Sequence, residues 1–160
     1  MTFTFYTPKN IIIHHEAGNA GFNAVNEYHR QKWNFLSSLG FYIAYQYYIE
    51  KSGKIYQGRR DTEEGAHTRG WNKNSIGICL QGNFDLEKPN PAQLTSLEGL
   101  LNRLKKDYNL KDGDIYGHRE KSQTSCPGKN LFIWLLLWRQ VWTIQKLILV
   151  IKEMIKGRGK

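Results

Sequence analysis

The 160-residue sequence contains only two cysteines, Cys79 and Cys126. Two cysteines are too few for the disulfide framework that holds small secreted domains together. A single Cys79–Cys126 disulfide is one alternative for the pair, but Cys79 lies in the apolar stretch I-G-I-C-L, which favours a buried core residue. The chain must therefore fold mainly by burying apolar surface, and it is long enough to do so as one domain.

The sequence also lacks an uninterrupted apolar run of about 20 residues, the length that spans a bilayer. The run L-F-I-W-L-L-L-W at 131–138 ends at Arg139 and Gln140. We expect residues 131–160 to form an apolar and cationic helix that docks on the domain, faces an anionic membrane or a partner, or spans a membrane. The N-terminus has no basic segment followed by an apolar one, so we expect no signal peptide and a chain that is cytoplasmic as synthesised.

Acidic residues are scarce, with 14 of them against 23 basic residues, which gives a net charge of +9. Such an excess attracts polyanions: nucleic acid, an anionic membrane or a phosphate-rich wall polymer. The basic residues are scattered along the chain, and their spacing matches no nucleic-acid-binding motif. We therefore expect no specific nucleic-acid partner.

Apolar periodicity and turn residues predict an α/β domain with a central mixed sheet flanked by helices. A proline one residue after Asn90 marks the start of the second helix. Residues 58–74 are rich in polar residues and glycine, which is typical of a long functional loop. The expected elements are, in order, a strand at 11–15, a helix at 22–38, a strand at 41–49 with a hairpin partner at 54–57, a strand at 75–80, a helix from Pro91 to Tyr108 and a strand at 114–117.

Two distant fragments carry the candidate chemistry, I-I-I-H-H at 11–15 and G-H-R-E-K-S-Q-T-S-C-P-G at 117–128. Each follows or ends an expected strand, and the ends of neighbouring strands can present ligands to one point. Two imidazoles and one thiolate, from His14, His118 and Cys126, make a three-ligand set for zinc with the fourth position open. A metal held in this way is a hydrolytic catalyst, provided that the three side chains meet in space.

Five stretches, in order along residues 11–130, extend this pattern. They are I-I-I-H-H-E-A at 11–17, Y-Q-Y-Y-I-E-K-S-G-K-I-Y-Q-G-R at 45–59, G-A-H-T-R-G-W-N-K-N-S-I-G-I-C-L-Q-G-N-F at 65–84, P-A-Q-L at 91–94 and G-H-R-E-K-S-Q-T-S-C-P-G at 117–128. With them the chain resembles the zinc-dependent N-acetylmuramoyl-L-alanine amidases, a family shared by phage lysozyme-type endolysins and peptidoglycan recognition proteins.

The resemblance implies roles for individual residues. It implies Zn²⁺ as cofactor, with His14, His118 and Cys126 as its ligands. The catalytic residues that it implies are Tyr45 and Thr124, hydrogen-bond donors to a developing oxyanion. The residues that it places at the substrate are His67, Trp71, Asn72 and His15.

The resemblance also implies a peptidoglycan recognition protein-like fold, with an amidase domain at 1–130 and the tail at 131–160. The implied activity is hydrolysis of the amide between N-acetylmuramic acid and L-alanine in peptidoglycan, by a phage or prophage endolysin that acts on the cell wall after release. One alternative is a non-catalytic peptidoglycan-binding module, although members that only bind typically lack the cysteine. Another is a regulatory partner of a nucleic-acid enzyme, which no residue here specifically supports.

Two positions depart from the family pattern, and one histidine stands apart from it. Glu16 follows the histidine pair where small or hydroxyl residues are usual, and it either orients an imidazole or is solvated. Thr124 stands where some members carry a lysine, so it can only hydrogen-bond. His29 lies on the apolar face of the first helix, and we expect a core histidine.

Overall fold

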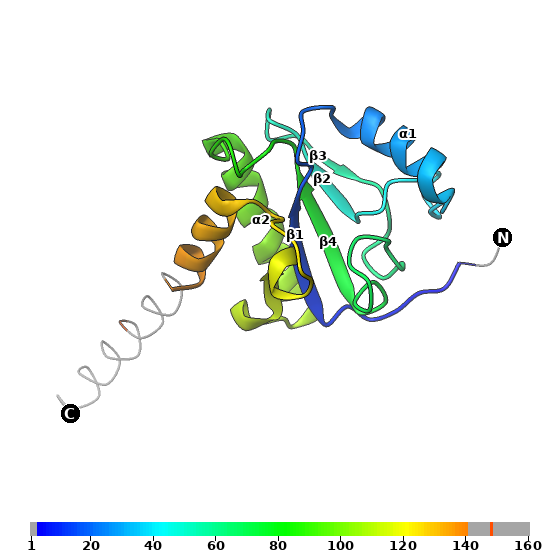
Figure 1. Ribbon diagram of the computed structural model, residues 1–160. Helices are drawn as coiled ribbons and strands as arrows, with labels where there is room; N and C mark the ends of the chain where they lie inside the picture. The colour runs from blue at the N-terminus through cyan, green and yellow to red at the C-terminus, as the bar shows by residue number, and fades with distance from the viewer. Residues whose placement is uncertain (1–2, 141–147, 149–160) are drawn as a thin grey trace, which may run out of the picture.

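The computed structural model describes residues 3–140 and residue 148 and centres on a five-stranded sheet (Figure 1). Across the sheet the order is β3-β2-β4-β1-β5. Strand β1 is parallel to both of its neighbours, β4 and β5, and β2 pairs parallel with β4 and antiparallel with β3. The strands are β1 Asn10–His15, β2 Tyr47–Ile49, β3 Ile55–Gln57, β4 Ser75–Leu80 and β5 Ile115–Gly117. The expected α/β class with a mixed sheet is confirmed.

Helices cover both faces of the sheet (Figure 1). Helix α2, Pro91–Tyr108, and the helical residues 129–140 lie against one face, and helix α1, Phe22–Trp33, lies on the other. The larger core, on the α2 face, contains Ile11 and Ile13 of β1, and the smaller core contains Phe22 and Val25 of α1. Two short 3-10 turns, Asp112–Asp114 and His118–Glu120, precede and follow β5.

Asparagine lies at the start of α2 and at the end of α1. Asn90 caps α2 as expected, because its side chain accepts from the Gln93 backbone while the Gln93 side chain accepts in return. Helix α1 ends at Asn34, which adopts a left-handed conformation with φ of 48°. The prediction of a helix over 22–38 is therefore wrong in its last residues.

The segment 41–46 is not a strand, although aromatic residues predicted one over 41–49. Asn26 of α1 accepts from the backbone N–H groups of Tyr42 and Ile43, and His29 accepts from that of Ala44. These side chains take up the donors that a strand would give to its neighbour, so β2 is restricted to its last three residues.

The structure bears on two further alternatives, the Cys79–Cys126 disulfide and the placement of the C-terminal segment. Cys79 is buried in the core and both cysteines are free thiols, so the disulfide alternative is wrong. Residues 129–140 are helical, and Leu131, Leu135 and Trp138 are buried in the larger core. Within the described residues, no helix is both long and apolar enough to cross a bilayer. The expectations for residues 141–160 fall, except at residue 148, outside the described part of the chain.

Candidate metal centre

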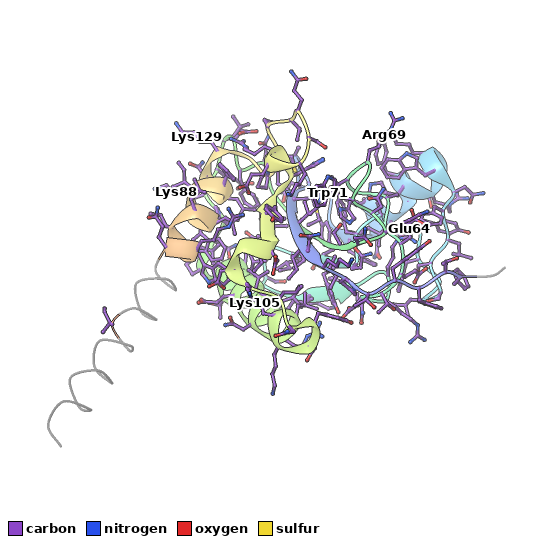
Figure 2. All side chains as sticks on the ribbon, turned by 90° about the horizontal axis from the view of Figure 1, so that it is seen from below. Glu64, Arg69, Trp71, Lys88, Lys105 and Lys129 are labelled. Atoms are coloured by element: carbon purple, nitrogen blue, oxygen red, sulfur yellow. The ribbon has the colours of Figure 1, made fainter. Side chains whose placement is uncertain are left out.

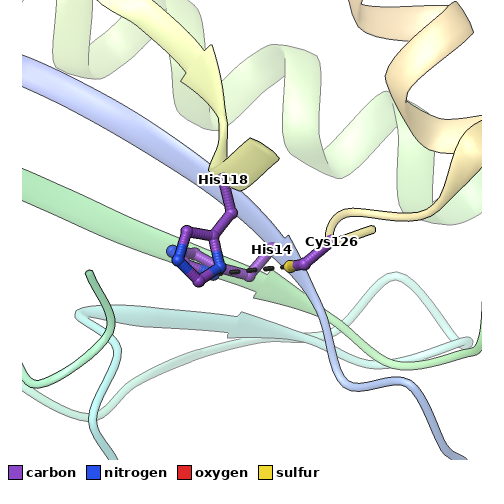
Figure 3. A group of neighbouring side chains, drawn as sticks. All are labelled: His14, His118 and Cys126. Atoms are coloured by element: carbon purple, nitrogen blue, oxygen red, sulfur yellow. Dashed lines mark hydrogen bonds between the residues drawn. The ribbon is translucent and has the colours of Figure 1, made fainter. Parts of the chain in front are cut away.

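The three expected ligands meet at one edge of the sheet. His14 lies near the carboxyl end of β1, and His118 follows the carboxyl end of β5, the parallel neighbour of β1. Cys126 returns to them on the loop that follows, which the bond from the Arg119 N–H to the Cys126 carbonyl closes at 2.8 Å. Figure 3 shows the three side chains converging, and their donor atoms lie within 4.8 Å of one another. Parallel pairing of β1 and β5 is what brings these distant parts of the sequence together.

The donor set fits a zinc ion. The Cys126 sulfur lies 3.6 Å from Nδ1 of His14, and zinc–nitrogen and zinc–sulfur bonds at the tetrahedral angle put these atoms about 3.6 Å apart. Burial, with the neighbouring histidines His67 and His118, keeps the pKa of His14 well below its usual value, so its imidazole is neutral and free to bind. Burial also raises the pKa of the Cys126 thiol to about 12, so a thiolate there requires a cation beside it.

His67 holds the ring of His14 from behind. With Nδ1 of His14 facing Cys126, its Nε2–H points at Nδ1 of His67, 3.1 Å away, and the Thr68 hydroxyl lies within 3.4 Å of the same nitrogen. The His67 ring fits only because Gly65 and Gly77 have no side chains, since a Cβ at either would come within 2.6 Å of it. This arrangement is typical of the outer partner that fixes the tautomer of a metal-binding histidine.

Tyr45 lies beside the three ligands, with its ring 5.1 Å from that of His14. Burial first, and then the nearby Cys79 and Cys126 thiols, raise the pKa of Tyr45 well above its usual value. Its hydroxyl therefore keeps its proton and remains a hydrogen-bond donor. Thr124 is exposed, and its Oγ1 accepts from the Cys126 backbone N–H at 3.2 Å, which leaves its own proton free to donate.

The residues expected at the substrate lie in different environments in the structure. His67 is only 8% exposed, so it lies behind His14 rather than at the surface. Asn72 accepts from the His67 and Thr68 backbone N–H groups at 2.9 and 2.8 Å and so shapes the loop. Trp71 is half-buried and stacks under the Lys121 ammonium, 4.0 Å away.

His15 faces away from the three ligands. Successive side chains of a strand point to opposite faces, and His15 shares the face of Ile11 and Ile13. There it is buried, and its Nδ1 accepts from the Phe84 backbone N–H at 3.2 Å. The structure thus differs from the expectation that His15 contacts substrate, because the alternation of β1 directs it under the loop at Phe84.

A cavity of ≈ 440 Å³ opens between α1 and Tyr45. Sequence reasoning missed it because the i, i+4 spacing of Tyr28 with Lys32 and of His29 with Trp33 also fits a core-facing helix. Glu16 is neither an imidazole partner nor simply solvated, since it accepts from the Ala20 N–H and from the Tyr48 hydroxyl. The lining residues are Glu16, Ala20, Ala24, Val25, Tyr28, His29, Lys32, Trp33 and Tyr45.

Comparison with known proteins agrees with a hydrolytic metal centre of this kind. Residues 4–129 match the model of the family described as N-acetylmuramoyl-L-alanine amidase. Peptidoglycan-recognition protein SC2 of Drosophila melanogaster is 34% identical over 138 residues, which cover 79% of this chain and 72% of that protein.

Solved structures agree with this assignment. The amidase LysC from Clostridium intestinale URNW has a TM-score of 0.70 at 33% identity and covers 81% of this chain and 87% of its own. The ectodomain complex of peptidoglycan recognition proteins LCa and LCx, solved with tracheal cytotoxin bound, gives a TM-score of 0.75 at 29% identity, with 86% and 87% covered. The chain therefore belongs to the N-acetylmuramoyl-L-alanine amidase family, with a fold like that of peptidoglycan recognition proteins.

Proposed function

We propose that this chain is a zinc-dependent amidase that hydrolyses the bond between N-acetylmuramic acid and L-alanine in peptidoglycan. The observation that carries the proposal is the convergence of His14, His118 and Cys126 beside a protonated Tyr45. A zinc ion bound by these ligands supplies a water nucleophile near neutral pH and polarises the scissile carbonyl.

The protein residues have separate tasks in this reaction. His14, His118 and Cys126 leave one side of the centre open for water and substrate, as three protein ligands do. The Tyr45 hydroxyl donates to the oxyanion that forms when the amide carbonyl is attacked, and the Thr124 hydroxyl donates from the loop opposite. His67 fixes the tautomer and the orientation of the His14 ring.

The rival function is a peptidoglycan-binding module without catalysis, since relatives of this chain are named for peptidoglycan recognition. The presence of Cys126 favours the amidase, because a module that only binds has no use for a half-buried thiol next to two imidazoles. One neutral thiol and two imidazoles offer little to an uncharged sugar–peptide ligand, whereas the same atoms complete a hydrolytic metal set.

The test combines metal content with bond specificity. Purified protein should contain about one zinc per chain and release new L-alanine amino termini from purified peptidoglycan, and a chelator should abolish the release. Cys126→Ser and His118→Ala should each lose the zinc and the release together, while Ser122→Ala, on the same loop, should keep both. Full release by Cys126→Ser, or tight peptidoglycan binding by a zinc-loaded chain that never cleaves, would contradict the amidase proposal.

We further propose an endolysin role, in which the chain is made in the cytoplasm and reaches the wall after release, aided by contact with an anionic membrane or wall polymer. The helical residues 129–140 bury one apolar side and expose another. Lys129 begins this helix, and Lys88 lies beside it (Figure 2). A helix that is apolar on all sides is normally buried, so its exposed apolar side marks a contact with a membrane or a partner. The exposed side chains are Ile133, Leu136 and Leu137, which are 44%, 39% and 56% exposed.

Vesicle binding tests this contact. The double variant Ile133→Glu and Leu137→Glu should stop sedimentation with vesicles of phosphatidylglycerol and should leave cleavage of purified wall unchanged. Leu86→Glu, at a side chain that is 84% exposed outside the helix, is the matched control. Equal sedimentation of the double variant and the control would remove the membrane contact.

A further inference from the structure

His118 follows a strand at the edge of the sheet. Strand β5 is three residues long, and in the described part of the chain its sheet partner is β1 on one side only. His118 begins the 3-10 turn His118–Glu120 directly after it (Figure 3). An edge strand leaves a row of backbone donors and acceptors without a strand partner. A metal ligand at the end of such a strand depends on other contacts for its position.

Arg139, near the end of the helical residues 129–140, contacts both ends of the segment that holds His118. Its Nη2 donates to the Ile115 carbonyl oxygen, at the start of β5. Its Nη1 and Nη2 also donate to the two carboxylate oxygens of Glu120, at 3.0 and 2.8 Å. A guanidinium that donates two parallel bonds to a carboxylate fixes its direction as well as its distance. One side chain thus bridges residues 115 and 120.

Glu120 extends this contact to the backbone beside His118. Its Oε2, which accepts from Arg139, also accepts from the Gly117 backbone N–H at 2.7 Å. The same helix packs closely at Gly117, because a Cβ there would lie 2.9 Å from the Phe132 ring. The residue before the metal ligand is therefore held by a carboxylate that Arg139 orients and by an aromatic ring one helix turn or more from Arg139.

Lys121 holds the other end of the turn. Its backbone N–H donates to the His118 carbonyl at 2.9 Å. Its ammonium lies 3.5 Å from the centre of the Tyr116 ring and 4.0 Å from that of Trp71, which are distances typical of cation–π contacts. These contacts do not require Arg139. Loss of Arg139 should therefore loosen the turn without unfolding it.

We propose that Arg139 is a positioning residue of the candidate metal centre, which acts through Glu120 to hold the backbone of His118 where zinc binding requires it. This inference rests on the zinc site of the proposed function. Residue 139 lies outside the stretch 4–129 that matches the family, so the contact is made by the C-terminal segment of this chain. The alternative is an ion pair that only stabilises the fold, since both side chains are partly buried.

Three variants separate these roles. Arg139→Gln removes the charge and both bonds to the carboxylate. Arg139→Lys keeps the charge, but an ammonium lacks the planar fork that reaches the Ile115 carbonyl and the carboxylate together. Arg103→Gln is the matched control, because Arg103 also joins a helix to other parts of the fold. Its guanidinium donates to the Tyr47 hydroxyl at 2.7 Å and to Asp107 at 3.1 Å rather than to the segment 115–120.

Zinc affinity of the folded, full-length chain is measured by competition with a chromophoric chelator, and stability by urea unfolding in EDTA. Arg139→Gln should bind zinc at least about fivefold more weakly than the wild type. A charge effect alone would have the opposite sign, because removal of a nearby cation strengthens the binding of Zn²⁺. Arg139→Lys should also bind more weakly. Arg103→Gln should lose stability and keep wild-type zinc affinity.

A double-mutant cycle tests the route through Glu120. Glu120→Gln keeps an acceptor for the Gly117 N–H but loses the charged pair with Arg139. Independent effects on zinc affinity would multiply in the double variant. If Arg139 acts through Glu120, the variant with both substitutions should bind zinc more tightly than the product of the two single losses predicts.

Wild-type or tighter zinc binding by Arg139→Gln would overturn the proposal, as would an equal loss in Arg103→Gln or a fully multiplicative loss in the double variant. If Arg139→Gln fails to fold, Arg139→Lys decides by the same criteria. A wild type that binds no zinc would overturn this proposal and the proposed function together. A chain whose zinc affinity depends on Arg139 but which never cleaves peptidoglycan would sink the amidase and leave the role of Arg139 standing.

Discussion

Gly128→Ala should break the metal centre while leaving all three ligands in the sequence. Gly128 has a φ of +84°, and a Cβ there would come within 2.5 Å of the Phe84 carbonyl carbon and 2.7 Å of the Asp85 nitrogen. Both are backbone atoms and cannot rotate away. The loop must therefore move by about 0.9 Å to restore the ordinary contact of 3.4 Å.

That displacement is large for a metal ligand two residues away. Zinc–sulfur bonds tolerate about 0.2 Å around 2.3 Å, so a shift of this size at Cys126 removes the ligand. Loss of an outer partner alone costs about 10- to 100-fold in metal affinity, and loss of a ligand should cost at least about 100-fold. In the metal-free chain, left-handed strain and overpacking together should cost about 2–4 kcal/mol of unfolding free energy.

Gly40→Ala is the matched control. Gly40 has a φ of +85°, nearly that of Gly128, and a Cβ there meets no atom within 4 Å. It should lose about 1–2 kcal/mol of stability through backbone strain and bind zinc as the wild type does. Zinc affinity is measured by competition with a chromophoric chelator, and stability by urea unfolding in EDTA. Wild-type zinc affinity in Gly128→Ala would refute the reasoning.

Three further predictions concern other parts of the structure. His67→Leu should weaken zinc binding about 10- to 100-fold in the same competition assay, because Nε2–H of His14 loses its acceptor; unchanged affinity would remove His67 from the centre. Since burial lowers the pKa of His29 from 6.5 to about 4, the unfolded chain binds a proton in that range that the native chain does not, so this contribution to stability is complete above pH 6.5 and is lost as the pH falls toward 4. The free energy of unfolding measured with urea should therefore fall over this range by up to about 3 kcal/mol more in the wild type than in His29→Asn. Parallel pH profiles of the two proteins would contradict the lowered pKa. Asn90→Ala should cost about 1 kcal/mol of unfolding free energy through loss of the cap with Gln93, and a loss no larger than that of exposed Thr95→Ala would argue against the cap.

The sequence was most informative where local rules decide the structure. Strand β1 follows from its apolar run, and α2 from Asn90, Pro91 and the leucine spacing. It was least informative at 41–46, where Asn26 and His29 of α1 bind the backbone and prevent a strand. Such a contact joins a helix residue to backbone that follows the helix in the sequence, and it produces no periodic pattern from which it could be predicted.

The candidate site shows the same division. The family resemblance named His14, His118 and Cys126, and the structure brings them together. It also named His15, but the alternation of a strand already predicts that neighbours face opposite ways, and the structure follows the alternation. The cavity beside α1 could not be predicted from the sequence, because the α1 residues that line it have the same helical spacing as residues that face a core.

The parallel pairing of β1 with β5 has a consequence for how the protein would acquire the proposed zinc ion. His14 comes from the start of the chain and His118 from its far part, so the complete ligand set exists only once the sheet has formed. The cores on both faces of the sheet are built from apolar side chains and do not depend on the ion. We therefore expect metal starvation to leave a reserve of folded, inactive protein, which returning zinc activates at once without new synthesis or refolding.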